Sequence, residues 1–238
     1  MDRTACPLCG RQDQIDRRRT SLEIATNDPR PLYTALDALA RQYGWHINYE
    51  DPRYATVDLV DDTAPSWLLQ YRDGHHVYAV AGGAFNVKIP TDGLFPLDPT
   101  QIISAVIAAY NASGNPGRFE LRATNREWFD VVATSARDGP QKAVLDTVMS
   151  FDTADTVDAT INLRNFCEKL SGRNGQAVVF GGTGSPSSNR LDQARIELHA
   201  KNRPAREILR QMFKQVGFMD TWRLLYDPDT NKYWLRFR

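Results

Sequence analysis

The residues best suited to chemistry in this sequence are the two cysteines of the segment Cys6-Pro7-Leu8-Cys9-Gly10. Two thiolates at this spacing supply half of a tetrahedral zinc site, and the same spacing serves a redox dithiol. A closed zinc site needs two further ligands at similar spacing, and none follows locally. The flanks are polar, whereas a redox pair needs a strand before it and a helix after it. Zinc or redox chemistry at Cys6 and Cys9 is therefore an alternative, and we predict no cofactor.

The remaining candidate groups fit structural roles better than catalytic ones. Cys167 lies on the apolar stripe of a predicted helix, where a cysteine is usually a small core residue. His75 and His76 are adjacent, so in a strand they point to opposite faces and make a poor metal pair. The run Gly181-Gly182-Thr183-Gly184-Ser185 lacks the lysine of a phosphate-binding loop. Because no Ser, His and Asp set has the context of a catalytic triad, we expect a protein that is not an enzyme.

Four predicted helices share one pattern of apolar residues. Residues 31–43 and 204–216 each place apolar side chains at i, i+3, i+4, i+7, i+8 and i+11, which forms one stripe on a helix. Each of these two helices begins at a proline and is followed by a glycine, Gly44 or Gly217. Residues 99–111 and 158–170 carry a shorter version of the same stripe.

Segments of alternating apolar and polar residues follow the helices and predict strands and hairpins. The order of elements is the same in two parts of the chain, which predicts two tandem copies of one domain. The first copy is predicted as a strand at 21–26, helix 31–43, strands 45–49 and 85–89, helix 99–111 and a hairpin over 118–134. The second is predicted as a strand at 144–151, helix 158–170, strands 176–180 and 194–199, helix 204–216 and a hairpin over 221–237.

The predicted fold class is α+β, with two tandem β-α-β-β-α-β-β sandwich domains, each with two helices packed on a small sheet. Residues 1–20 are predicted to be a disordered polar leader. The first domain covers 21–137 with an insertion at 53–84, and the second covers 140–238. The helix and strand stripes predict a common set of buried residues: Leu36, Leu39, Ile47, Val106, Ile107, Leu209, Met212, Leu224 and Leu235.

The net charge of the whole chain is zero, but the charge is unevenly distributed. Residues 21–139 hold 9 basic and 15 acidic groups, and residues 140–238 hold 15 and 11. Opposite signs favour contact between the two halves, or self-association of the acidic first domain with the basic second domain of a neighbour. A neutral chain lacks the basic footprint of most nucleic-acid-binding proteins. We therefore expect no nucleic-acid partner, and a nucleic-acid-binding α+β module is the second alternative.

The stretch from Leu32 to Pro52 resembles the start of the secretin and TonB short N-terminal domain family. That family typically has a Leu-x-x-Ala-Leu-x-x-Leu-Ala helix, a glycine, and a strand ending in Tyr-Asp-Pro. Here the helix runs from Leu32 to Ala40 and the strand ends in Tyr49-Glu50-Asp51-Pro52. Residues 196–237 are similar to the second half of the family. The sequence departs from the pattern in its insertion, in the doubled domain, and in lacking a barrel or a secretin pore.

The resemblance implies a non-catalytic protein–protein interaction module of the bacterial cell envelope. Such a module docks partner proteins at the periplasmic end of an outer-membrane machine, so the partner would be a cell-envelope or secretion component. No secretory signal is visible between Met1 and Thr20, and a cytoplasmic location therefore stays open. The longest apolar stretch is about half of the roughly 20 residues that a spanning helix needs, so we expect no membrane span.

The predicted partner-binding residues are Trp234, Arg236 and Arg238 on the last strand. Tyr233, Leu235 and Phe237 share the other phase of that strand and are expected in the core. We expect this strand to be an edge of its sheet, since a small open sheet has two edges. Trp234 either packs among cations as a structural residue or forms a basic aromatic surface for an acidic partner.

Overall fold

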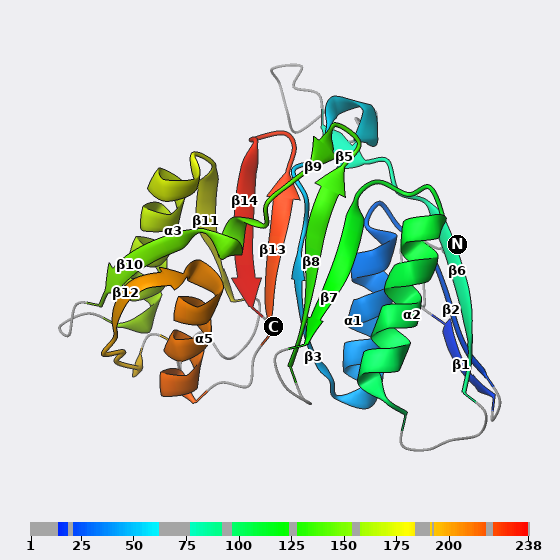
Figure 1. Ribbon diagram of the computed structural model, residues 1–238, viewed down its shortest axis with the longest axis horizontal. Helices are drawn as coiled ribbons and strands as arrows, with labels where there is room; N and C mark the ends of the chain where they lie inside the picture. The colour runs from blue at the N-terminus through cyan, green and yellow to red at the C-terminus, as the bar shows by residue number, and fades with distance from the viewer. Residues whose placement is uncertain are drawn as a thin grey trace, which may run out of the picture.

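In the computed structural model, the described residues are 14–18, 21–61, 77–91, 97–123, 128–153, 158–183, 191, 193–217 and 221–237. They form an α+β fold with four long helices (Figure 1). We call residues 21–136 the first half and residues 140–237 the second half. None of the helices in the described ranges is long and apolar enough to cross a membrane.

The first half places two helices between two groups of strands. Helix α1 begins at a proline, and Gly44 closes it in the left-handed conformation with φ 71°. Within the insertion, a short 3₁₀ helix, η1, is followed by a two-stranded sheet of β4 and β5. The elements in chain order are β1 (Gln14–Arg18), β2 (Ser21–Asn27), α1 (Pro31–Tyr43), β3 (His46–Glu50), η1 (Thr56–Asp58), β4 (Leu59–Asp61), β5 (Tyr78–Val80), β6 (Ala84–Pro90), α2 (Pro99–Ala112), β7 (Arg118–Ala123) and β8 (Trp128–Ala136).

The second half has its elements in a matching order. Strand β9 and a 3₁₀ helix, η2, connect it to the first half. Strand β10 pairs with β12 as β2 pairs with β6, and both pairs are antiparallel. The elements are β9 (Gly139–Pro140), η2 (Val144–Asp146), β10 (Val148–Asp152), α3 (Ala159–Asn174), β11 (Ala177–Thr183), β12 (His199–Pro204), α5 (Ala205–Val216), β13 (Trp222–Asp227) and β14 (Lys232–Phe237).

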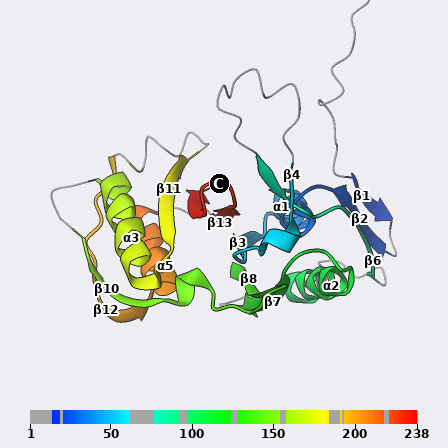
Figure 2. The same cartoon turned by 90° about the horizontal axis from the view of Figure 1, so that it is seen from above.

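One central sheet joins the two halves. Its strand order is β11-β14-β13-β3-β8-β7, and β9 pairs with β8 off this path. Viewed from above, α3 and α5 lie on one side of this sheet, and α1 and α2 lie on the other (Figure 2). The small sheets β10-β12 and β1-β2-β6 form the outermost layers. The shared sheet therefore places a helix from each half over strands of the other half.

Each half has its own apolar core, and the insertion contributes to the core of the second half. Tyr54 and Val80 pack in the cluster that contains Leu209 and Leu224. The other cluster lies between α1, α2 and the first-half strands. All nine residues predicted to be buried are at most 7% exposed, which confirms the predicted stripes: Leu36, Leu39, Ile47, Val106, Ile107, Leu209, Met212, Leu224 and Leu235.

Five sequence predictions need correction. The strand predicted at 144–151 starts only at Val148, since residues 144–146 form η2, and the helix predicted at 158–170 runs on to Asn174. The last strand, β14, is not an edge, because it lies between β11 and β13; the edges of the central sheet are β7 and β11. The strand predicted at 194–199 forms instead at 199–204, since Ile196 and Leu198 are buried without a regular ladder partner. Residues 14–18, predicted to be disordered, form β1 by pairing with the edge of β2.

Candidate interaction surface at the junction of the two halves

Strands β13 and β3 form the backbone contact between the halves. They are parallel, and the paired residues are Arg223 with Tyr49 and Leu224 with Glu50. Side chains extend this short ladder, because the Trp222 amide donates to the side chain of Asn48 at 3.0 Å. Side-chain hydrogen bonds thus satisfy backbone amides that have no partner in the short β13–β3 ladder.

On one face of the junction, α5 of the second half binds acidic residues from both halves: Glu50 and Asp130 of the first and Asp146 of the second. Arg206 pairs with Glu50 at 2.7 Å, with Asp130 at 3.5 Å and with Asp146 at 3.3 Å. Arg210 pairs with Asp130 as well. Burial alone raises the pKa of Glu50, and the charge of Arg206 opposes this shift. The arrangement keeps buried carboxylates next to guanidinium groups, which buried charges require.

On the opposite face, α1 of the first half covers β13. Arg223 donates to Asp37 at 3.2 Å and to the Ile47 carbonyl at 2.6 Å. The Arg223 guanidinium also lies 5.6 Å from the centre of the Tyr33 ring. Arg41 pairs with Asp37 from the next turn of α1. Asp37 is thus shared by two arginines, one from each half.

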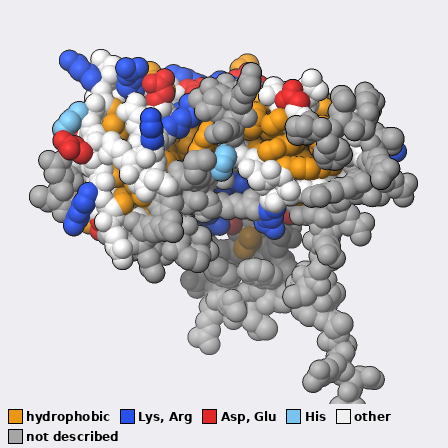
Figure 3. All heavy atoms as spheres, turned by 90° about the horizontal axis from the view of Figure 1, so that it is seen from below, with side chains coloured by type: hydrophobic (Ala, Val, Ile, Leu, Met, Phe, Trp, Pro, Cys, Tyr) orange, Lys and Arg blue, Asp and Glu red, His pale blue; other side chains and the backbone are white. Residues whose placement is uncertain are grey.

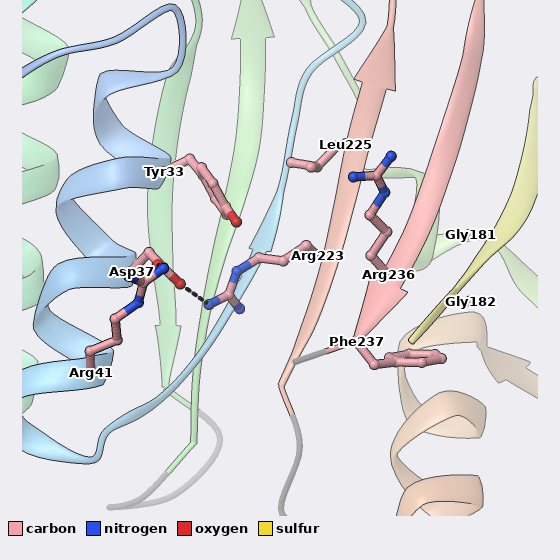
Figure 4. Close-up of a pocket in the computed structure, with 9 residues that line it drawn as sticks. All are labelled: Tyr33, Asp37, Arg41, Gly181, Gly182, Arg223, Leu225, Arg236 and Phe237. Carbon is pink, nitrogen blue, oxygen red and sulfur yellow. Dashed lines mark hydrogen bonds and ion pairs between the residues drawn. The ribbon is translucent and has the colours of Figure 1, made fainter. Parts of the chain in front are cut away.

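A hollow of about 340 Å³ opens beside this second face. In Figure 4, Tyr33, Asp37 and Arg41 approach it from α1, and Arg223 lies on the adjacent strand β13. No partner of the Arg236 guanidinium is found among the described residues, whereas Arg223 is bound to Asp37. The hollow therefore combines cationic and apolar side chains, and its lining comprises Tyr33, Asp37, Arg41, Gly181, Gly182, Arg223, Leu225, Arg236 and Phe237.

Two of the three predicted partner-binding residues, Trp234 and Arg236, lie at or beside this hollow. Trp234 is half-buried on β14, and its indole N–H donates to Asp227 at 3.2 Å. Burial by itself would raise the pKa of Asp227, but hydrogen bonds from Thr230 and Trp234 lower this pKa below its ordinary value. Arg236 is exposed and lines the hollow. Arg238 lies outside the described residues.

The structure describes only one of the cysteine and histidine candidates of the sequence. Cys6, Cys9, His75 and His76 lie outside the described residues. Cys167 is buried in the second-half core, and burial raises the pKa of its thiol to about 12. Across the described ranges, no group of three or more His, Cys, Asp or Glu side chains is placed to hold a metal ion.

Sequence reasoning missed the charged residues of the junction. Glu50 and Asp130 lie in the polar phase of their strands, which usually faces water, yet each side chain is 1% exposed. The available signal was the opposite charge of the halves, together with Arg206 and Arg210 one turn apart on α5. That signal indicated contact between the halves without identifying the residues.

On the face seen in Figure 3, basic and acidic side chains are interspersed over the described surface, with apolar side chains between them. The described part of that face accordingly shows no extended region of one charge. Searches of protein-family models, curated proteins and solved structures find no match to this chain.

Proposed function

We propose that this chain is a non-catalytic protein–protein interaction module of the bacterial cell envelope. The observation that carries the proposal is the accessible surface formed by Trp234, Arg236 and the neighbouring hollow. Aromatic and arginine side chains are the residues most enriched at energetically important protein contacts. The cell-envelope assignment rests on the resemblance of 32–52 and 196–237 to the secretin and TonB short N-terminal domain.

The chemistry of the surface favours a partner with apolar and acidic groups. Arg236 offers a guanidinium that can bind a carboxylate through two hydrogen bonds. Leu225 and Trp234 are paired across β13 and β14 and supply half-buried apolar area beside it. The edge of β11 that faces away from β14 is an end of the central sheet and can accept a strand from a partner.

Site-specific photo-crosslinking tests this proposal. A photoreactive phenylalanine analogue replaces Trp234 in the full chain, expressed in its native host, and the matched control carries the analogue at Ile161, an exposed position on α3. We expect a crosslinked product at position 234 that is absent at position 161. Equal products at both positions, or none at 234, contradict the proposal.

A substitution separates binding from stability at the same residue. Trp234→Ala removes the indole that bonds to Asp227. The proposal requires that association is lost while the melting temperature changes little. A large fall in melting temperature with association retained would assign Trp234 a purely structural role.

A further inference from the structure

The strand pairing that joins the two halves inside the molecule can be repeated between molecules, at the two end strands of the central sheet. In the first half, β3 pairs parallel with β8, and β8 pairs antiparallel with β7. In the second half, β11, β14 and β13 pair in the same way. Inside the central sheet, β13 lies against β3. The two end strands are β7, which corresponds to β13, and β11, which corresponds to β3.

The two end strands also run in the same direction. Between β11 and β7 the sheet contains two antiparallel pairs, β14-β13 and β8-β7, and its other neighbouring pairs are parallel. Two reversals restore the original direction. Strand β7 of one molecule can therefore lie parallel to β11 of another, in the orientation that β13 and β3 have inside the molecule.

The end strands expose the apolar residues that the internal junction buries. By strand register, Leu121 on β7 corresponds to Leu224, and Phe180 on β11 corresponds to Tyr49. Leu224 is 0% exposed and Tyr49 is 2% exposed, at the positions where β13 and β3 pair. Leu121 and Phe180 are only half-buried. A second molecule at each end would complete their burial.

On each end strand, a helix side chain binds the backbone N–H and C=O of one residue at the outer edge. Asn111 of α2 bonds to both the amide and the carbonyl of Phe119. Ser171 of α3 bonds to both the amide and the carbonyl of Val178. The internal junction likewise combines a short backbone ladder with side-chain caps. Beyond each cap, the next outward-facing residue of the end strand keeps its backbone N–H and C=O available for pairing with a partner strand.

The helices that would cover the two kinds of junction differ in charge. The buried residues of α2 and α5 have the same spacing, which aligns Thr100 and Ser104 with Arg206 and Arg210. Arg206 and Arg210 bind the acidic residues of the first half. Thr100 and Ser104 are exposed, and α2 carries no charged residue. Helix α2 therefore suits a surface without buried carboxylates.

The surface at the β11 end has that character. The strand register aligns Trp234 with Asp130, and Gly181 with Glu50. Where the internal junction needs guanidinium groups, the β11 end presents an indole and a glycine. The short side chain of Ser104 leaves room for the Trp234 ring. At these aligned positions the two ends are thus complementary in size, and neither end places a charged side chain there.

We propose that this protein associates head to tail with a second copy of itself, with β7 and α2 of one molecule covering β11 and Trp234 of the next. The inference rests on the proposed function, because it names the partner of the Trp234 surface. The contact joins two different surfaces, so each pair of molecules keeps one free end of each kind, and further copies can add.

Sedimentation velocity on the purified full chain tests the inference. We expect the average mass of the wild type to rise with concentration above 26.9 kDa, the mass of one chain. Ser104→Arg blocks one end, and Trp234→Arg blocks the other while keeping a donor for Asp227. Each variant alone should stay at the mass of one chain. Their equimolar mixture should form a dimer that does not grow, because one end of each kind stays intact.

Two results would overturn the inference: a wild type that stays at one chain mass at every concentration, or a mixture of the two variants that stays monomeric while the wild type associates. Thermal melts of both variants exclude misfolding as the cause. A monomeric wild type that still crosslinks a different protein at position 234 contradicts the head-to-tail contact alone. Absence of any crosslink there contradicts the proposed function.

Discussion

Arg206 forms ion pairs with three carboxylates at the junction, those of Glu50, Asp130 and Asp146. Its side chain is 7% exposed, and those of Glu50 and Asp130 are each 1% exposed. Burial alone lowers the pKa of Arg206, and the nearby carboxylates more than offset this effect. Such a group stabilises the fold only while its partners are present, because an unpaired buried charge is costly.

Arg206→Ala should therefore lower the free energy of unfolding by about 3–5 kcal/mol, since it leaves Glu50 and Asp130 buried with fewer cationic partners. Urea denaturation followed by circular dichroism measures the change. Arg203→Ala is the control, because the Arg203 side chain is 60% exposed and its loss should cost no more than about 0.5 kcal/mol. Similar losses for the two variants would contradict a stabilising role of the buried cluster.

Asp146 makes this junction sensitive to acid. Burial by itself would raise the pKa of Asp146. The hydrogen bond from Arg122 and the charge of Arg206 outweigh this effect and lower the pKa below its ordinary 3.8. The stability that Asp146 contributes is therefore fully present above pH 3.8 and is lost as the pH falls through its lower folded pKa.

Asp146→Asn should remove this contribution at neutral pH, so the stability difference between wild type and variant should shrink on acidification. Urea midpoints over a series of pH values from neutral to acid measure the difference. Asp138→Asn changes a carboxylate at an exposed position and serves as the control. A difference that stays constant at every pH would show that the charge of Asp146 does not act through this titration.

At the scale of elements, the sequence predicted α1, α2 and α5 to within one residue at each end, because each is amphipathic and has a local end signal. Helix α3 instead runs four residues past its predicted end at 170 and is closed by Gly175. Helix α1 matches the predicted 31–43 at both ends, where Pro31 and Gly44 fix the boundaries. The strand near Ile196 was misplaced for a physical reason. Leu198 is buried, but its amide donates to the side chain of Thr153 instead of to a strand. An alternating pattern of apolar and polar residues indicates which side chains are buried, but it does not indicate which group the backbone amide binds.

Gly82, near the end of the insertion, packs closely against the residues at the start of α1. A Cβ atom at Gly82 would lie 2.2 Å from the Pro29 carbonyl oxygen and 2.7 Å from the Pro31 side chain. A Cβ atom at Gly83 would have nothing within 4 Å. The close approach is therefore specific to the first glycine of the pair.

Gly82→Ala should lower the free energy of unfolding by about 1–3 kcal/mol, the usual cost of overpacking a site that cannot relax easily. Gly83→Ala should leave it unchanged or raise it by up to about 1 kcal/mol. Guanidinium denaturation of both variants gives the comparison. Equal effects would mean that the chain shifts at Gly82 to admit a methyl group.

At the scale of the whole molecule, the fusion of the sheets could not be predicted from the sequence. Strand patterns specify which face of β13 or β3 is apolar, but both edges of a strand carry the same backbone groups. Asn48 and Glu50 occupy the phase that faces water in an isolated domain. They are buried because α5 of the other half covers them. Two domains with separate sheets were consistent with every local pattern, and the matching element order leaves their origin by duplication a prediction.

The shared sheet and the crossing residues should make the two halves unfold together. Tyr54 of the insertion packs in the core of the second half, and Arg206 and Arg223 each bind carboxylates of the first half. Opening either half alone would expose these buried groups without a partner. Separate unfolding should therefore be much less favourable than joint unfolding.

We expect a single urea transition with the same midpoint by tryptophan fluorescence and by far-ultraviolet circular dichroism. In native-state hydrogen exchange, the slowest amides of β8 and β14 should open with the same free energy, because each strand lies inside the shared sheet. A variant with both Arg206→Ala and Arg223→Ala should separate these two values, since it removes the cations that join the halves. The double variant Arg203→Ala with Arg236→Ala changes two exposed arginines instead and should keep the values equal. Two transitions in the wild type would mean that the halves are stable without each other, so that the junction only orients them.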